Sequence, residues 1–146
     1  MMSQIPSQNQ CFISHSYADA SAIAACLKRR LPNGWAPFVF PAVAASPDEA
    51  ISAFLVDALR AAEGLVYLNT PVSLASFWVA FERSMAARLG KPVFAFHPRR
   101  PFFAFKRDKS QPPDPMISVL FNLCIDRDVE TIQQVRDAVW DRYRFE

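Results

Sequence analysis

Glycine is scarce in this chain of 146 residues, which contains only Gly34, Gly64 and Gly90. Phosphate-binding turns such as the P-loop and GxGxxG need several glycines close together, because the backbone there approaches the phosphates closely. Neither motif is present. Their absence excludes a nucleotide cradle of backbone amides after the first strand, and with it redox chemistry of the Rossmann type.

Cysteines and long apolar runs are also few. Cys11, Cys26 and Cys124 form an odd set, and each falls in an apolar or helical pattern, which favours buried reduced thiols and shows no metal-ligand spacing. No apolar run reaches the roughly 18 residues of a membrane span, and the first residues lack the pattern of a secretion signal. We therefore expect a cytoplasmic protein with no metal and no membrane partner, in which a flexible segment 1–10 precedes a single domain 11–146.

Charge of one sign is not in excess either. A net charge of +2 arises from 16 basic and 14 acidic residues, which is too balanced to predict a nucleic-acid partner. The most basic stretch, 97–109, interleaves aromatic residues and is compatible with contact to phosphates, nucleic acid, anionic lipid or a partner domain. A solvated loop whose phenylalanines tuck under it is the interpretation that the overall charge favours.

Five short apolar runs recur along the chain, which is 51% apolar. None alternates cleanly with polar residues, as is typical of strands buried on both faces of a parallel sheet. The runs cover residues 11–14, 38–40, 65–68, 93–96 and 119–125. With helical patterns between them, they predict an α/β fold: a flavodoxin-like, doubly wound, five-stranded parallel sheet in the order 2-1-3-4-5 with helices on both faces.

Helical patterns follow the first, second, third and fifth runs. They cover about 19–31, 46–63, 73–89 and 129–143. Ser16 is expected to open the first helix, Ser46 is the expected N-cap of the second, and Gly90 is expected to end the third. The stretch 97–116, rich in Pro, Phe and basic residues, is expected to form a long loop with at most a short helix.

Polar side chains gather where the first and third strands should end. In the predicted strand order a binding crevice lies at this edge, between these two strands. The candidates for binding a ribose or a diphosphate are Ser14, His15, Ser16 and Tyr17, whereas Asn69 and Thr70 are candidates for lining the crevice, and Ser76 is a further candidate for substrate binding. Helix capping or turn formation explains residues of this kind almost as well. A phospho-receiver is excluded, because it needs an aspartate where Asn69 stands.

Trp78 and Glu82 are four residues apart on the third expected helix and therefore share one side of it, near the crevice. Such a pair suits cleavage of an N-glycosidic bond to a cationic base. The indole stacks on a flat ring, and the carboxylate holds ribose hydroxyls and stabilises an oxocarbenium-like transition state. The alternative is a core tryptophan beside a solvated edge glutamate, which the spacing alone does not exclude.

The run FISHS at 12–16 with Asp19, the run SFWVAFE at 76–82 and the run GKPV at 90–93 resemble motifs of TIR (Toll/interleukin-1 receptor) domains, and the resemblance covers 11–143. It implies a flavodoxin-like fold. As in many bacterial and plant members, it also implies hydrolysis of NAD+ to nicotinamide and ADP-ribose or a cyclic ADP-ribose, often in anti-phage defence or cell death. By this resemblance Glu82 is the catalytic glutamate, Trp78 helps to form the nucleotide site, and NAD+ is a substrate with no further cofactor.

One feature of the family is missing. After the second strand many members carry an Arg-Asp-x-x-Pro-Gly type signature for domain assembly and gating of the pocket, whereas this chain has PAVAASPDEA at 41–50. The resemblance implies self-association, or pairing with another TIR domain or a sensor subunit, but not by this signature. A non-catalytic TIR interaction module is the alternative function, and nucleoside deoxyribosyl transfer is a third.

Overall fold

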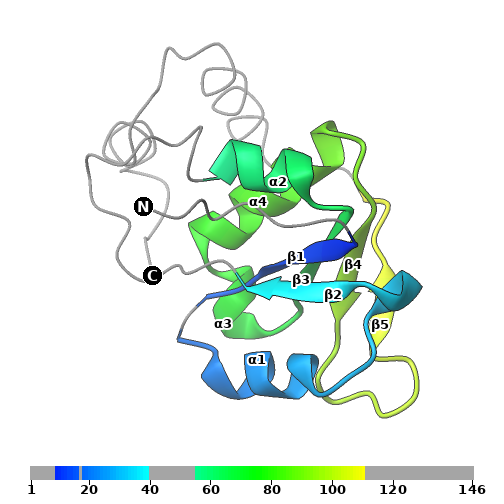
Figure 1. The fold of residues 1–146 in the computed structure, drawn as a ribbon. Helices are drawn as coiled ribbons and strands as arrows, with labels where there is room; N and C mark the ends of the chain where they lie inside the picture. The colour runs from blue at the N-terminus through cyan, green and yellow to red at the C-terminus, as the bar shows by residue number, and fades with distance from the viewer. Residues whose placement is uncertain (1–8, 17, 40–54, 111–146) are drawn as a thin grey trace, which may run out of the picture.

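A five-stranded sheet forms the centre of the structure, a computed structural model that describes residues 9–16, 18–39 and 55–110 (Figure 1). Its strand order is β2-β1-β3-β4-β5. The strands are β1 (Gln10–Ser14), β2 (Ala36–Val39), β3 (Gly64–Leu68), β4 (Val93–Phe96) and β5 (Phe105–Arg107). The first four confirm the apolar runs predicted within this part of the chain.

The predicted strand order is confirmed, but the prediction of a fully parallel sheet is wrong. β1 pairs in parallel with β2 and β3, and β3 with β4, whereas β5 runs antiparallel to β4. The chain after β4 turns back at once, since His97 N donates to the carbonyl of Ala104 at 2.6 Å, and a direct return can only give an antiparallel pair. β5 lies inside the predicted loop 97–116, and the predicted strand 119–125 lies outside the described residues.

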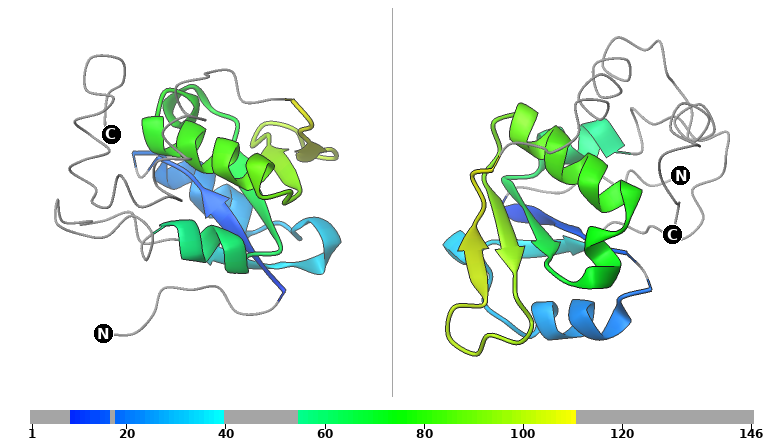
Figure 2. Two further views of the ribbon diagram at one scale, coloured as in Figure 1. Left: turned by 90° about the horizontal axis from the view of Figure 1, so that it is seen from above. Right: turned by 180° about the vertical axis from the view of Figure 1, so that it is seen from behind.

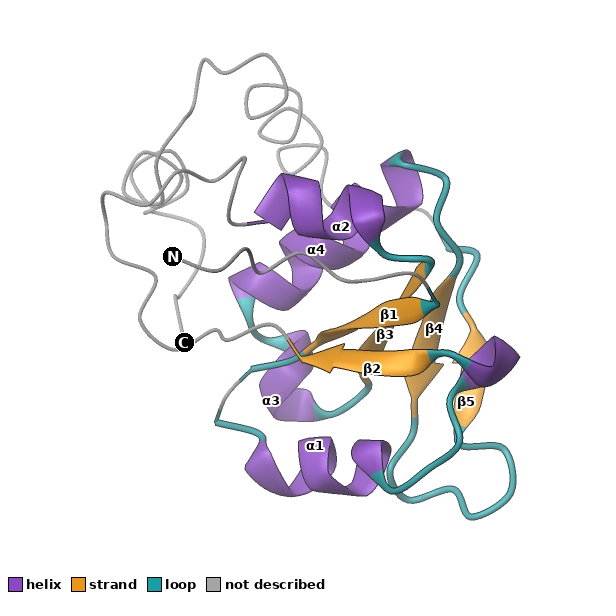
Figure 3. Cartoon of the chain, viewed as in Figure 1, coloured by secondary structure: helices purple, strands orange, loops and turns teal. Residues whose placement is uncertain are grey.

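Helices cover both faces of the sheet, as predicted (Figures 1 and 3). The helices are α1 (Ala20–Leu27), α2 (Asp57–Ala61), α3 (Pro71–Leu74) and α4 (Phe77–Arg88), with a short 3-10 helix η1 (Pro32–Gly34) before β2. The helices α2 and α4 lie on one face and α1 on the other, as the views from above and behind also show (Figure 2). No described helix has both the length and the apolar character needed to cross a membrane.

Each face of the sheet has its own apolar cluster, because successive residues of a strand point to opposite sides. Phe12 and Leu65 join the cluster under α2 and α4. Their neighbours Ile13 and Val66 join the cluster under α1. All four side chains are fully buried, which explains why the strand sequences do not alternate with polar residues.

The third predicted helix is two helices. Thr70 is the N-cap of α3, where its Oγ1 accepts a hydrogen bond from Ser73 N at 3.2 Å and Pro71 occupies the first turn. Ser76 then takes an extended conformation and becomes the N-cap of α4, so the predicted start near Ser73 was wrong. The end was correct: Gly90 has φ +74° just after the helix, and Lys91 N donates to Ala86 O at 3.0 Å.

The first helix is shorter than predicted and has a different N-cap. It begins at Ala20 with Asp19 as the N-cap and ends at Leu27, so the predictions of Ser16 as its opening residue and of an end near residue 31 were wrong. Ser16 instead forms a turn in which its carbonyl accepts from Asp19 N at 3.0 Å. The predicted N-cap Ser46 and the predicted helix 129–143 lie outside the described residues.

The cysteines in the described part of the chain are free and buried, as predicted. Burial raises the pKa of Cys11 and of Cys26 to about 12, so both are thiols, with no reactive thiolate, at neutral pH. Cys124 lies outside the described residues.

Gly64, at the start of β3, is required by close packing. A Cβ atom at this position would lie 2.5 Å from Cη2 of Trp35 and 2.9 Å from the carbonyl oxygen of Pro92. We expect Gly64→Ala to lower the free energy of unfolding by about 1–3 kcal/mol, as overpacking does. Urea denaturation measures this change, and adding Trp35→Phe should restore part of it. An unchanged midpoint for Gly64→Ala would contradict the packing argument.

Candidate functional site

The fold brings Ser14 and Glu82 together, although they are 68 residues apart. Ser14 is the last residue of β1 and is fully buried, and Glu82 lies in α4 with 7% of its surface exposed. The Ser14 hydroxyl donates a hydrogen bond of 2.7 Å to Oε1 of Glu82. A polar strand end and the glutamate of the SFWVAFE run therefore meet at the carboxyl edge of the sheet.

Burial controls the ionisation of Glu82. It raises the pKa of this carboxyl group to about 8, and the hydrogen bond from Ser14 lowers the pKa by less than burial raises it. At neutral pH the group is therefore mostly protonated in the described state. A positive charge brought next to Glu82 would favour the carboxylate, so ionisation of this group is coupled to the approach of a cation.

A second polar cluster surrounds Asp19, which is 8% exposed. Its Oδ2 accepts hydrogen bonds from Thr70 Oγ1 and from Ser73 Oγ, the latter at 2.7 Å. The Ser73 hydroxyl in turn accepts from Ser16 N at 3.2 Å. This cluster ties the start of α1 to α3, and so joins the segments that follow β1 and β3. The hydroxyl of Thr70, a predicted ligand-binding group, is engaged within the protein.

Asn69 and His97 form a third contact at this edge, after β3 and β4. Asn69 Nδ2 lies 3.3 Å from His97 Nδ1, while His97 Nε2 is buried without a hydrogen-bond partner among the described residues. Desolvation lowers the pKa of His97, helped by the charges of Arg100 and Lys106, so its imidazole is neutral at neutral pH.

The other predicted site residues have different surroundings. Nδ1 of His15 lies 3.2 Å from the carbonyl of Ile13, and burial lowers the pKa of this half-buried histidine. Trp78 packs edge-on against Phe77 and Phe81, with centroids 5.0 and 5.9 Å away. Its indole is partly buried and packs against the apolar cluster under α2 and α4, and its role in a nucleotide site stays a prediction. Ser76 is buried at the start of α4. Tyr17 lies outside the described residues.

Three residues at this edge were not among the predicted site residues. Asp19 and Ser73 belong to the cluster described above, and His97 follows β4. The sequence position of each residue could have identified it. Asp19 and Ser73 lie within the polar stretches after the first and third strands, and His97 is the first polar residue after the fourth strand. Within the described residues, no group of three or more His, Cys, Asp or Glu side chains could hold a metal ion.

Arg83, the neighbour of Glu82, takes part in a three-residue clamp with Tyr67 and Asp108. Arg83 Nη2 lies 3.1 Å from Asp108 Oδ2, Tyr67 donates to the same oxygen at 2.8 Å, and the guanidinium lies 3.9 Å from the centre of the tyrosine ring. Burial opposes the ionisation of Asp108, but bonds from Ser110 and Tyr67 and the charge of Arg83 outweigh it and lower its pKa. The clamp thus connects β3, α4 and the residue after β5.

The Asp19 cluster makes a testable contribution to stability. Asp19→Ala would leave two hydroxyl groups, on Thr70 and Ser73, without their acceptor, and we expect a loss of about 2–4 kcal/mol in the free energy of unfolding. Chemical denaturation gives the value. Glu63→Ala, which removes an exposed carboxylate, is the matched control and should change stability by less than about 0.5 kcal/mol. Equal effects of the two variants would show that the cluster contributes nothing.

Comparisons of the chain with protein-family models, with curated proteins and with solved structures find no match. The fold and the site define an α/β protein with a mixed five-stranded sheet, in which a buried serine–glutamate pair lies at the carboxyl edge.

Proposed function

We propose that this chain is a TIR-like NAD+ hydrolase or cyclase that cleaves the bond between nicotinamide and ribose. The contact between Ser14 and Glu82 carries the proposal, because it joins the two sequence motifs that resemble the family, FISHS and SFWVAFE. It also lies where open α/β sheets bind ligands, at the carboxyl ends of β1 and β3, around which the strand order reverses.

In the proposed reaction the bond from C1′ of the ribose to the pyridinium nitrogen breaks, and its electron pair leaves with nicotinamide, which becomes neutral. The departing base needs no proton, so a general acid is unnecessary. Positive charge develops on the ribose, and the Glu82 carboxylate stabilises it and accepts hydrogen bonds from ribose hydroxyls. Water then adds to C1′ and loses a proton to give ADP-ribose, or an adenine nitrogen adds to give the cyclic product.

The raised pKa of Glu82 fits a site that ionises when its substrate binds. The carboxyl group has a pKa of about 8 and is mostly neutral before binding. The pyridinium of NAD+ is a cation, and its approach would lower this pKa and favour the carboxylate that the reaction needs. Ser14 would act as a positioning residue, because its hydroxyl holds Oε1 of Glu82 at 2.7 Å.

Incubation of the purified chain with NAD+ tests the proposal. Chromatography should show nicotinamide together with an equal amount of ADP-ribose or cyclic ADP-ribose, and the second product distinguishes hydrolase from cyclase. Dilute and concentrated samples are both needed, because the proposal includes activation by self-association, by another TIR domain or by a sensor subunit. Nicotinamide release is expected in at least one of them. We place the activity in the cytoplasm, in anti-phage defence or cell-death signalling.

The second candidate is a non-catalytic interaction module of the same family. The burial of the Ser14–Glu82 pair favours it, since a glutamate that is only 7% exposed also suits a purely structural contact. This candidate predicts self-association that increases with protein concentration while the NAD+ concentration stays constant. Sedimentation equilibrium combined with the nicotinamide assay therefore separates the two candidates.

A further inference from the structure

Two phenylalanines project from the loop between β4 and β5, so the expectation that the phenylalanines of this loop tuck under it is wrong for these two. Phe102 is 88% exposed and Phe103 81% exposed, whereas the other large hydrophobic side chains that are exposed in the described part of the chain reach 46% at most. Exposed aromatic rings of this size are unfavourable in water, and two adjacent ones form a candidate contact site.

The loop that carries these rings is fixed to the body of the protein. His97 N donates to Ala104 O at 2.6 Å and Arg100 N to His97 O at 3.1 Å, which closes the loop on itself. Arg29, just after α1, donates to the carbonyl of Pro101 at 2.9 Å. Ala104 is buried in the apolar cluster under α1. The backbone on both sides of the two rings is therefore held in place, and the rings face solvent.

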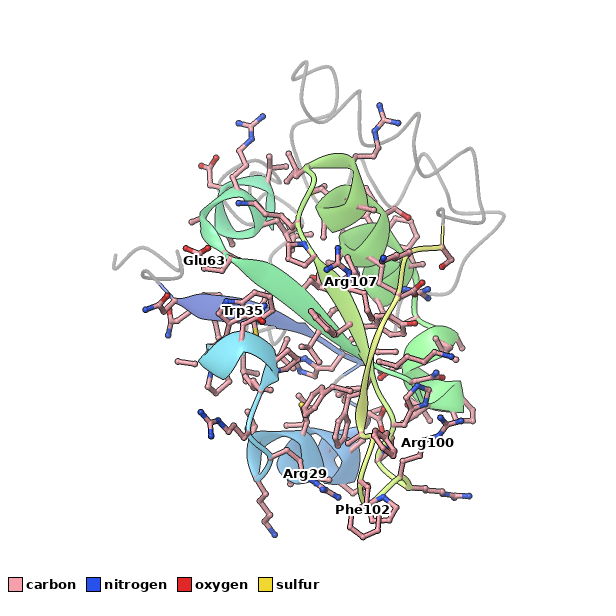
Figure 4. The ribbon with its side chains drawn as sticks, turned by 90° about the vertical axis from the view of Figure 1, so that its right-hand side faces the viewer. Arg29, Trp35, Glu63, Arg100, Phe102 and Arg107 are labelled. Carbon is pink, nitrogen blue, oxygen red and sulfur yellow. The ribbon has the colours of Figure 1, made fainter. Side chains whose placement is uncertain are left out.

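Cationic side chains lie in the loop that carries the rings and in the segment after α1 that contacts this loop through Arg29. Exposed basic residues come from the end of α1 and from the loop itself: Lys28, Arg29, Arg30, Arg99 and Arg100. No Asp or Glu occurs at 20–47 or at 91–107, so these segments carry only positive charge. Figure 4 shows Arg29, Arg100 and Phe102 toward the same end of the molecule and the acidic Glu63 toward the other.

We propose that this loop binds the surface of an anionic lipid bilayer. Phe102 and Phe103 would enter the boundary between headgroups and acyl chains, and the basic residues would contact the lipid phosphates. Phenylalanine has no hydrogen-bonding group, so its rings suit an apolar layer better than a nucleic-acid backbone. Such a contact needs no spanning helix. It differs from the sequence-based expectation that the chain has no membrane partner, and the vesicle experiment below decides between the two. It does not depend on the proposed NAD+ chemistry.

Sedimentation of the full chain with lipid vesicles tests this proposal. Binding should be at least about tenfold stronger to phosphatidylcholine vesicles with about 30% phosphatidylserine than to phosphatidylcholine alone. Phe102→Ser with Phe103→Ser should weaken binding to the anionic vesicles at least about tenfold. Val72→Ser with Leu74→Ser, which removes two exposed apolar side chains of α3, is the matched control and should bind as the parent does.

Three results would overturn the proposal. The first is equal binding to the two kinds of vesicle or to neither. The second is unchanged vesicle binding by the phenylalanine variant. The third is self-association in the absence of lipid, measured by light scattering, if the phenylalanine variant abolishes it. The rings would then bind a second copy of the chain.

Arg99→Gln with Arg100→Gln, which keeps both rings, should weaken binding only to the anionic vesicles. Circular dichroism establishes that each variant is folded.

Discussion

Replacing Glu82 by glutamine is expected to reduce nicotinamide release by at least about 100-fold, the size of effect seen when a charge-stabilising group is lost from a transition state. Glutamine has nearly the same shape, and its side-chain carbonyl still accepts the bond from Ser14. It lacks the negative charge that the developing ribose cation requires. The measurement is the initial rate of nicotinamide formation from NAD+, followed by chromatography, under the conditions in which the parent chain is active.

The matched control for this experiment is Glu63→Gln, which alters an exposed glutamate and should leave the rate unchanged. Because the carboxylate is the active form in the proposed reaction and burial raises the pKa of Glu82 to about 8, kcat/KM of the parent should rise with pH between 6 and 8. Substantial nicotinamide release by Glu82→Gln, with its circular dichroism spectrum intact, would contradict the proposed role of Glu82.

The contribution of Glu82 to the stability of the folded chain should decrease as the pH rises. The pKa of Glu82 is about 8 in the folded chain, against an ordinary value of 4.5. Between these values the folded state retains a proton that the unfolded state has lost, so rising pH favours unfolding. We expect the contribution of Glu82 to the free energy of unfolding to decrease by about 1.4 kcal/mol per pH unit in this window and to level off above pH 8.

Urea denaturation at several pH values, for the parent and for Glu82→Gln, isolates this contribution. Taking the difference between the two curves removes the titration of every other group. The difference should favour the glutamine variant increasingly from pH 5 to pH 8, by several kcal/mol in total. The control Glu63→Gln should have the same free energy of unfolding as the parent at all pH values. A constant difference between the parent and Glu82→Gln would show that Glu82 titrates normally and is not buried as described.

Most of the described fold could be predicted from local patterns. Runs such as CFIS and GLVYL contain almost only residues that favour burial, and the helical patterns between them require the parallel order of the first four strands. The apolar runs in the sequence could not identify β5, because its residues, FKR, are few and mostly basic, and they form a strand only by pairing with β4. The helical pattern did not show the break between α3 and α4, since the apolar spacing continues across it. Only the N-caps at Thr70 and Ser76 separate these two helices.

The candidate site was predictable at the level of motifs but not of contacts. The topology alone places Ser14 at a strand end, and the SFWVAFE motif singles out Glu82. The hydrogen bond between them depends on the rotation of α4, which the sequence does not specify. The Asp19 cluster could not be predicted for a similar reason: Asp19 is the N-cap of α1, yet its carboxylate bonds Thr70 and Ser73 instead of capping that helix.

The clamp around Arg83 has a further consequence for α4. Successive residues of a helix point about 100° apart around its axis, so Glu82 and Arg83 attach α4 in two different directions. Glu82 holds the helix to the end of β1, and Arg83 holds it to Tyr67 and Asp108. Turning α4 about its axis would break both attachments at once. Because Ser14 and Tyr67 are neighbours in the sheet, a motion that exposes Glu82 while the Arg83 clamp stays intact must come from the strand end at Ser14 or from the side chain of Glu82 itself, and not from a turn of α4.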